Sequence, residues 1–221
     1  IAQVSKFNFN PKLFYNPNKK TDLYFGATIS KENRRGGSMS KIRNELSSFY
    51  FLDEQESSRI TSQFSAKYKL DETKTITLKN SNSSFDRYIN IDENILETST
   101  TFGGNQLNSF TELNLSINKE KQNINIGINA LSDKFTEDNF IPQPLRNQEY
   151  QTLGMYINHL WDISDKLAVE SGLRIDNVTA SSFQSKNDGQ NFILPKISTL
   201  YKLTPELSVR LGGGMGYRMP T

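Results

Sequence analysis

The residues that could carry acid–base or metal chemistry are few in this chain. It has one histidine, His159, and no cysteine, so the sequence predicts neither a thiolate site nor a histidine-built metal site. His159 lies close to Asp162 in the sequence, but neighbouring residues of a strand point in different directions. No nucleophile elbow or phosphate-binding glycine loop occurs. We therefore expect no enzymatic activity, no bound metal and no cofactor.

Charged, small and other non-apolar residues instead alternate with apolar ones in two segments near the end of the chain. In residues 166–176, one face of a strand would hold Leu167, Val169, Leu173 and Ile175, and the other Lys166, Glu170, Arg174 and Asp176. In residues 206–218, one face would hold Leu207, Val209, Leu211, Met215 and Tyr217, and the other Arg210, Arg218 and three glycines. Such alternation predicts strands with one face in an apolar medium and the other in water.

About ten segments of this kind follow one another, and the links between them alternate in length. The short links are residues 16–20, 71–74, 118–122, 161–165 and 203–205. The long links are residues 31–58, 90–105, 133–148 and 177–190. Tight turns at one rim and long polar loops at the other are typical of an outer-membrane β-barrel. The sequence thus predicts an all-β, antiparallel meander that forms part of a large transmembrane β-barrel.

The apolar faces of these segments carry no charge. This fits a surface in lipid, where a lysine or arginine at mid-depth costs roughly 2–4 kcal/mol. A strand of about 12 residues, tilted by roughly 45°, also covers an apolar layer of about 25 Å. The alternative is a soluble sandwich, whose strands also alternate but are usually shorter, about five or six residues.

The composition restricts the class of protein further. Of 221 residues, 35% are hydrophobic, and the mean hydropathy is −0.60. No run of about 18 apolar residues occurs, which excludes a transmembrane helix but not barrel strands, because only alternate barrel positions are apolar. With 26 basic and 24 acidic residues, the chain lacks the charge of a nucleic-acid-binding domain. No signal peptide opens at Ile1, so we expect a processed protein or an internal piece of a longer one.

The last third of the chain carries motifs of a known family. Residues 153–176 (LGMYINHLWDISDKLAVESGLRID) and 192–221 (FILPKISTLYKLTPELSVRLGGGMGYRMPT) resemble strands of TonB-dependent outer-membrane receptors, especially those of Bacteroidetes. Residues 102–117 (FGGNQLNSFTELNLSI) are similar to the family's strand with an inward glutamate, which is Glu112 in this chain.

This resemblance implies a 22-stranded barrel in the bacterial outer membrane, with an N-terminal plug domain inside it and a TonB box that couples it to the inner membrane. About ten strands are too few for that barrel. We therefore expect residues 1–221 to be part of a single outer-membrane β-barrel domain, with the plug domain and the TonB contacts in regions outside this sequence. A closed ten-stranded barrel is the alternative.

Two sets of residues are candidates for function. The water-facing set would line the lumen, where the resemblance implies contact with the plug; plain solvation is the alternative. This set is Glu112, Glu170, Arg174, Asp176, Arg210 and Arg218. The long extracellular loops would bind the ligand, with solvated loop charge as the alternative. Their basic and aromatic candidates are Arg34, Arg35, Arg43, Phe49, Tyr50, Phe51, Phe135 and Phe140.

The function that the resemblance implies is active import, in which the receptor binds a scarce nutrient and passes it inward when TonB displaces the plug. The small ligand would belong to the siderophore, cobalamin, haem or glycan class, and outer-membrane lipid would surround the barrel. Asp133, Glu137 and Asp138 lack the spacing of a calcium loop. The alternative function is a small passive porin or an adhesin-like barrel.

Overall fold

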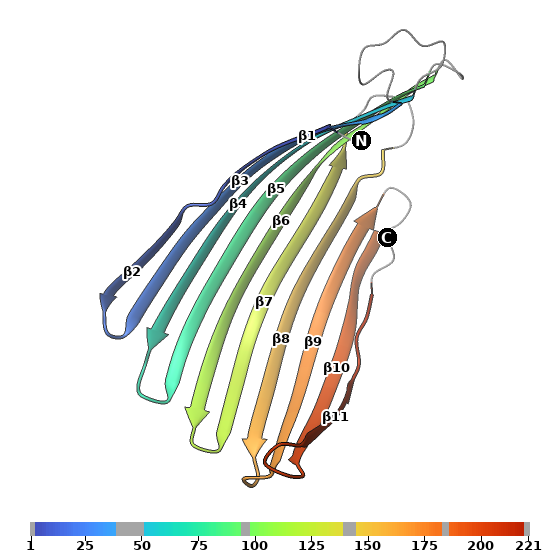
Figure 1. Ribbon diagram of the computed structural model, residues 1–221. Coiled ribbons are helices and arrows are strands. Elements are labelled where there is room, and N and C mark those ends of the chain that lie inside the picture. The colour runs from blue at the N-terminus through green and yellow to red at the C-terminus, as the bar shows by residue number, and fades with distance from the viewer. Residues whose placement is uncertain (1–2, 39–50, 94–97, 139–144, 183–185, 219–221) are drawn as a thin grey trace.

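The computed structural model describes residues 3–38, 51–93, 98–138, 145–182 and 186–218. Within these ranges the chain forms one antiparallel sheet of eleven strands, in which nearly every strand pairs with its neighbour in the sequence (Figure 1). No described helix is long and apolar enough to cross a membrane. The prediction of an all-β antiparallel meander is confirmed.

The strands are long. They are β1 (Gln3–Phe9), β2 (Lys12–Asn18), β3 (Thr21–Gly37), β4 (Phe51–Lys69), β5 (Lys74–Glu93), β6 (Thr98–Lys119), β7 (Gln122–Glu137), β8 (Gln148–Asp162), β9 (Leu167–Ser182), β10 (Lys186–Lys202) and β11 (Ser208–Gly214). The lengths from β3 to β10 run from 15 residues in β8 to 22 in β6.

The first two strands share one position at the edge of the sheet. β1 pairs with the far half of β3, and β2 pairs with the half of β3 nearest the turn. Pro11 separates them; proline has no N–H for a ladder bond and is tolerated at a sheet edge. Its carbonyl still accepts a hydrogen bond from Ala27 N at 3.1 Å. The eleven strands therefore occupy ten positions, as the sequence predicts.

The five short links all lie at one end of the sheet, which confirms their predicted place (Figure 1). In the β4–β5 turn, the Asp71 carboxylate accepts hydrogen bonds from the backbone N–H groups of Thr73 and Lys74 and from the Thr73 hydroxyl, each at 2.8 Å. This closes the turn with side-chain acceptors, as Asx-type turns do.

The long links are shorter than the sequence suggests. The predicted loop of residues 31–58 begins with the last seven residues of β3 and ends with the first eight of β4. The other three predicted loops likewise contain strand ends, including Gly103 and Gly104 in β6. The cause is that both faces of these strand ends are polar: in β3, Lys31 and Asn33 lie on one face and Glu32 and Arg34 on the other. Hydrophobicity therefore stops alternating while the backbone pairing continues.

The two faces of the sheet differ in chemistry and are named here by their residues. The apolar face includes Phe25, Phe64, Leu113, Ile128, Met155, Leu173, Ile193 and Leu211, which are half-buried or exposed. The polar face includes Lys79, Glu112, Asn129, Tyr156, Arg174 and Lys196. In the described part of the chain only Leu52 and Val178 are buried hydrophobic residues. A second sheet does not cover the first there, so the sandwich alternative is wrong.

The prediction for the last segment is wrong at Tyr217, which lies on the polar face. The alternation places it with Leu211 on the apolar face, but its ring stacks on Phe192 at 4.1 Å between centroids. Its hydroxyl donates to Asp176 Oδ2 at 3.1 Å, on the polar face. The regular strand β11 ends at Gly214, so the two-residue period no longer determines where Tyr217 points.

Candidate functional site

A row of paired residues crosses the polar face from β5 to β9. The register aligns Lys79, Glu112, Asn129, Gly154 and Asp176 side by side, each on the next strand of the sheet. Residues facing each other on antiparallel strands have Cβ atoms about 4.5–5.5 Å apart. The pairing thus brings together side chains that are up to about a hundred residues apart in the sequence.

Glu112 occupies the middle of the first cluster. Its Oε1 lies 3.2 Å from Lys79 Nζ, and its Oε2 accepts the Tyr156 hydroxyl at 3.2 Å. Asn114 donates to the same hydroxyl at 3.0 Å. Glu112, which the sequence predicts to face water, thus takes part in a chain of polar contacts across β5, β6 and β8.

Asp176 forms the second cluster with Arg174. Asp176 is 2% exposed. Its Oδ2 accepts a hydrogen bond from Arg174 Nε at 2.8 Å, and its Oδ1 forms an ion pair with Arg174 Nη2 at 2.8 Å but accepts no hydrogen bond. Arg174 Nη2 also donates to Asn129 Oδ1 at 3.0 Å. Burial of a charge is tolerated because it is paired and hydrogen-bonded. We call the residues of these two clusters the polar ladder: Lys79, Glu112, Asn114, Asn129, Tyr156, Arg174 and Asp176.

A third contact lies nearer to the short turns. Lys196 Nζ is 2.7 Å from Glu170 Oε1, and the charge of Arg210 also acts on Glu170. Arg210 lies opposite Leu200, in the row next to that of Ser198 and Glu170. Arg218 lies beyond the end of β11, so its predicted water-facing role remains a prediction.

Glycines of the polar face lie beneath the long side chains of neighbouring strands. A Cβ added at Gly127 would overlap the Tyr156 ring, and one at Gly154 would meet the Asp176 and Arg174 side chains. At Gly172 it would overlap the Lys196 side chain. These glycines let long side chains lie along the sheet instead of standing upright, a use of strand glycine seen where close approach is needed. A shallow hollow of about 430 Å³ remains between Glu112, Tyr156, Arg174 and Lys196.

A separate cluster lies at the end of the sheet away from the short turns. Glu137, the last residue of β7, accepts Arg146 N at 2.6 Å and Arg146 Nε at 3.0 Å. The Arg146 guanidinium lies 5.0 Å from the Phe102 ring centroid, and Phe102 stacks on Phe135 at 6.3 Å. We call Phe102, Phe135, Glu137 and Arg146 the rim clasp. Hydrogen bonding to Glu137 raises the pKa of Arg146 above its ordinary value, so the clasp keeps its charge pair at any physiological pH.

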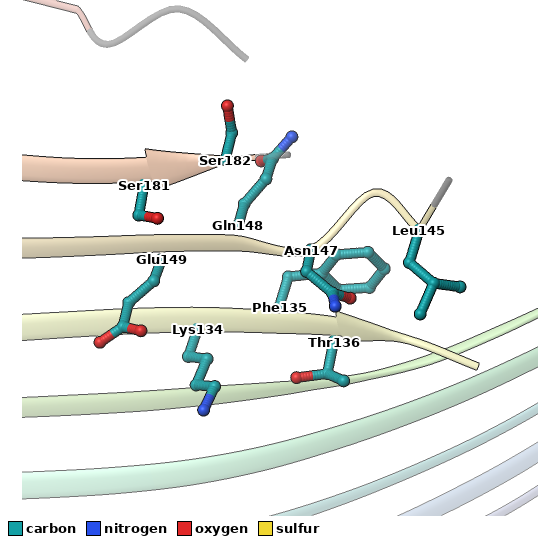
Figure 2. A pocket seen from close by; sticks show the side chains of 9 residues that line it. All are labelled: Lys134, Phe135, Thr136, Leu145, Asn147, Gln148, Glu149, Ser181 and Ser182. Atoms are coloured by element: carbon teal, nitrogen blue, oxygen red, sulfur yellow. The ribbon is translucent and has the colours of Figure 1, made fainter. Parts of the chain in front are cut away.

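The sequence does not reveal the rim clasp. Glu137 stands out only as a possible calcium ligand, and Arg146 lies nine positions further along. Only the β6–β7 pairing, which places Gln106 opposite Phe135, brings β6 beside these residues. Beside the clasp is a hollow of about 570 Å³ formed by the ends of β7, β8 and β9 and by Leu145 and Asn147; Figure 2 shows its lining residues.

The predicted ligand-binding residues do not form one cluster. Arg34 and Arg35 lie in β3 rather than in a loop, and adjacent strand residues point to opposite faces. Each is near an acid: Arg34 Nη2 lies 3.5 Å from Glu32, and Arg35 Nε 3.1 Å from Glu54. Phe51 begins β4, and Phe135 lies in β7 beside the hollow of Figure 2. The remaining candidates, Arg43, Phe49, Tyr50 and Phe140, lie outside the described residues.

Solved structures with the same fold include several transporters. The chain resembles FpvA of P. aeruginosa bound to heterologous pyoverdines (13% identity, TM-score 0.79) and the copper transporter OprC (10%, 0.76). It also resembles the ferric citrate transporter FecA in its unliganded form (13%, 0.74). Each match covers 96% of this chain but only 35%, 37% and 36% of the respective structures. At these identities the likeness concerns the fold alone.

The family is established by the sequence itself. No curated protein matches the chain, but a family model described as TonB dependent receptor-like, beta-barrel matches residues 3–221. The match covers nearly every residue and agrees with the meander of long strands. The chain therefore belongs to the β-barrel family of TonB-dependent receptors.

Proposed function

We propose that residues 1–221 form part of a single barrel domain of a Bacteroidetes-type, TonB-dependent transporter in the bacterial outer membrane. The protein would import a scarce nutrient of the siderophore, cobalamin, haem or glycan class and would have no catalytic role. The observation that carries the proposal is the contrast between the faces of the same strands. One face exposes residues such as Leu153 and Met155, and the other holds the polar ladder.

The apolar face would lie against lipid. Large exposed apolar surfaces mark contacts with a partner or a membrane, and here such residues lie on every strand from β3 to β10. On β8 they run from Leu153 to Trp161, roughly 26 Å along the strand and about 20 Å in height at a tilt of 40°. That height is close to the apolar band of an outer-membrane barrel, about 25 Å.

The polar face would line the lumen and meet the plug domain. Its charges are paired within the wall but are not all enclosed: the Lys79 side chain is 54% exposed and that of Lys196 is 47% exposed. Both ammonium groups can donate a further hydrogen bond to an acceptor on a second surface, as an interface with a removable domain requires. The hollow between Glu112 and Lys196 contains hydrogen-bond donors and acceptors, and side chains of both positive and negative charge. Solvation by a water-filled lumen is the competing role, and it requires no complementary surface.

The rim would make the first contact with the nutrient. Arg146 and Phe102 provide a cation over an aromatic ring, and Phe135 lines the adjoining hollow. Anionic chelates and planar rings are bound by such combinations. The other proposed ligand contacts of this rim are Arg34, Arg35, Arg43, Phe49, Tyr50, Phe51 and Phe140.

Growth of a strain that lacks the full-length gene tests the proposal. We expect loss of growth on one single source among ferric siderophores, cobalamin, haem and glycans, restored by the gene only while the proton gradient is intact. A passive porin would restore uptake in the presence of an uncoupler, and an adhesin would change surface binding without changing uptake. Either result would refute active import.

A further inference from the structure

The residues just before β8 lie over the polar face of the sheet. Arg146 precedes β8, which pairs with β7, yet its guanidinium lies 5.0 Å from the centroid of the Phe102 ring in β6. Phe102 and Glu112 are an even number of residues apart in β6, so both lie on the polar face. Residues 145–147 therefore reach across β7 on that face. We call residues 145–147 the strap.

The carboxylate of Glu137 ties the strap to the end of β7. It accepts hydrogen bonds from the backbone N–H of Arg146 at 2.6 Å and from Arg146 Nε at 3.0 Å, and Arg146 Nη2 is a third donor. The backbone N–H of Glu137 in turn donates to Asn147 Oδ1 at 2.9 Å. Two consecutive residues of the strap are thus joined to one residue of β7 through both backbone and side-chain groups.

An aromatic layer fills the space between the strap and the sheet. Gly104 lies opposite Glu137 in the register, and a Cβ at Gly104 would come within 2.7 Å of the Phe135 ring. The missing side chain lets this ring lie flat over β6, where it stacks with Phe102. Phe135 also lines the hollow of Figure 2 together with Leu145 of the strap. The strap therefore rests on packed side chains.

The two charges of the rim clasp are buried to very different extents. The Glu137 side chain is 6% exposed, whereas the Arg146 side chain is 64% exposed. An anion from solution can reach Arg146, but displacing it would leave Glu137 buried and charged without its partner, which is strongly unfavourable. We therefore expect an arriving anion to bind the exposed side of Arg146 and to leave the ion pair intact.

We infer that the strap is a fixed part of the inner rim, and that Glu137 is the positioning residue that holds Arg146 over the polar face. The strap stays closed before and after a ligand arrives. A contact that is already ordered saves the entropy of ordering it on binding, so Glu137 acts on ligand affinity through Arg146 without touching the ligand. This role in binding rests on the proposed import function; the closed state of the strap does not.

Amide hydrogen exchange in the full-length receptor, in lipid nanodiscs, tests the closed state. The backbone N–H of Arg146 reports directly on the clasp, because its acceptor is the Glu137 carboxylate. We expect this amide to exchange about tenfold faster in Glu137→Gln, the usual consequence of weakening one charge-assisted hydrogen bond. Asp133→Asn is the matched control, since Asp133 lies on the same strand and face but accepts Gln106. Its Arg146 amide should exchange as in the wild type.

The same measurement shows whether a ligand opens the strap. The probes are ferric enterobactin, haem, cobalamin and maltoheptaose, added singly to the wild type. Exchange at Arg146 should stay slow with each of them. Faster exchange on adding any probe would overturn the inference, and so would equal exchange in Glu137→Gln and the wild type. Unchanged exchange at Tyr156, in the middle of β8, shows that the sheet of each variant is intact.

Uptake kinetics test the role of Glu137 in binding. For a probe that the wild type takes up, Glu137→Gln should raise the half-saturating concentration about tenfold and leave the maximal rate unchanged. Loss of the negative charge alone would have the opposite effect on an anionic probe, because removing an acid beside the site favours anion binding. An unchanged or lower half-saturating concentration would overturn the positioning role. A wild type that takes up none of the four probes would instead refute the proposed import function.

Discussion

The two faces of one set of strands are specified by different physical requirements. On the apolar face, neighbours such as Phe25 and Phe64 pack at 4.9 Å between ring centroids. If that face lies against lipid, as we propose, any residue of similar hydrophobicity would serve there. On the polar face, Tyr156 needs a glycine beneath it at Gly127 and a carboxylate beside it at Glu112. The apolar face thus requires only residues that are hydrophobic, whereas the polar face requires particular residues in contact with one another. Three changes test this difference, and a fourth compares both faces with a short turn that belongs to neither.

A charge on the apolar face should have the largest effect. Ile128 lies in the middle of the apolar run of β7, so Ile128→Arg should destabilise the full-length receptor by about 2–4 kcal/mol in lipid. Denaturant unfolding in vesicles, followed by tryptophan fluorescence, measures the loss. Ser81→Arg on the polar face of β5 is the control and should cost less than about 1 kcal/mol. Equal losses at the two positions would contradict the assignment of the faces.

Filling a glycine of the polar face should come next. Gly127→Val would force the Tyr156 ring off the sheet and break its contacts with Glu112 and Asn114, at a cost of about 1–3 kcal/mol. Gly213→Val is the control, because a Cβ there has no atom within 4 Å. Combining Gly127→Val with Tyr156→Ala should recover part of the loss, since the clash needs both side chains. Strict additivity of the two changes would rule out this mechanism.

Removing the buried charge should have a smaller effect. Asp176→Asn keeps an acceptor for Arg174 and Tyr217 but loses the ion pair, which predicts a loss of about 1.5 kcal/mol. A double-mutant cycle with Arg174→Met isolates the pair from other effects. Glu206→Gln, in the exposed turn between β10 and β11, should leave stability unchanged. A coupling energy of zero in the cycle would show that the pair does not stabilise the wall.

The smallest effect should come from acid at a short turn. Hydrogen bonds from the Thr73 hydroxyl and from backbone N–H groups lower the pKa of Asp71 from 3.8 to about 2. The carboxylate therefore supports the turn fully above pH 3.8 and loses this role as the pH falls towards about 2. Amide exchange at Thr73 and Lys74 should accelerate over that interval relative to Asp71→Asn at the same pH. Identical exchange in the two proteins would contradict this role for Asp71.

The faces also explain what could be predicted from the sequence. Strands and short turns are predictable wherever one face is apolar, because the period of two is then visible, as in Leu167–Ile175. The outer ends of β3 and β4 are polar on both sides, so nothing in the sequence separates them from loops. Glu112, Glu170, Arg174 and Asp176 are recognisable as members of the polar face.

The partners of these residues are not recognisable from the sequence. Lys79 and Asn129 meet the ladder only through the register of several strand pairs, and a shift of one residue would send each to the other face. The same holds for the rim clasp, in which Phe102 and Arg146 meet across two strands. Local patterns therefore predict faces, whereas contacts depend on register.

The neighbour-by-neighbour pairing of the sheet has a kinetic consequence. Each strand from β4 to β11 pairs with the strand just before it in the chain, so loop closure during folding involves only short stretches of chain. Rates fall as contacts become more distant in sequence. We expect assembly to proceed hairpin by hairpin, with every completed strand serving as the template for the next.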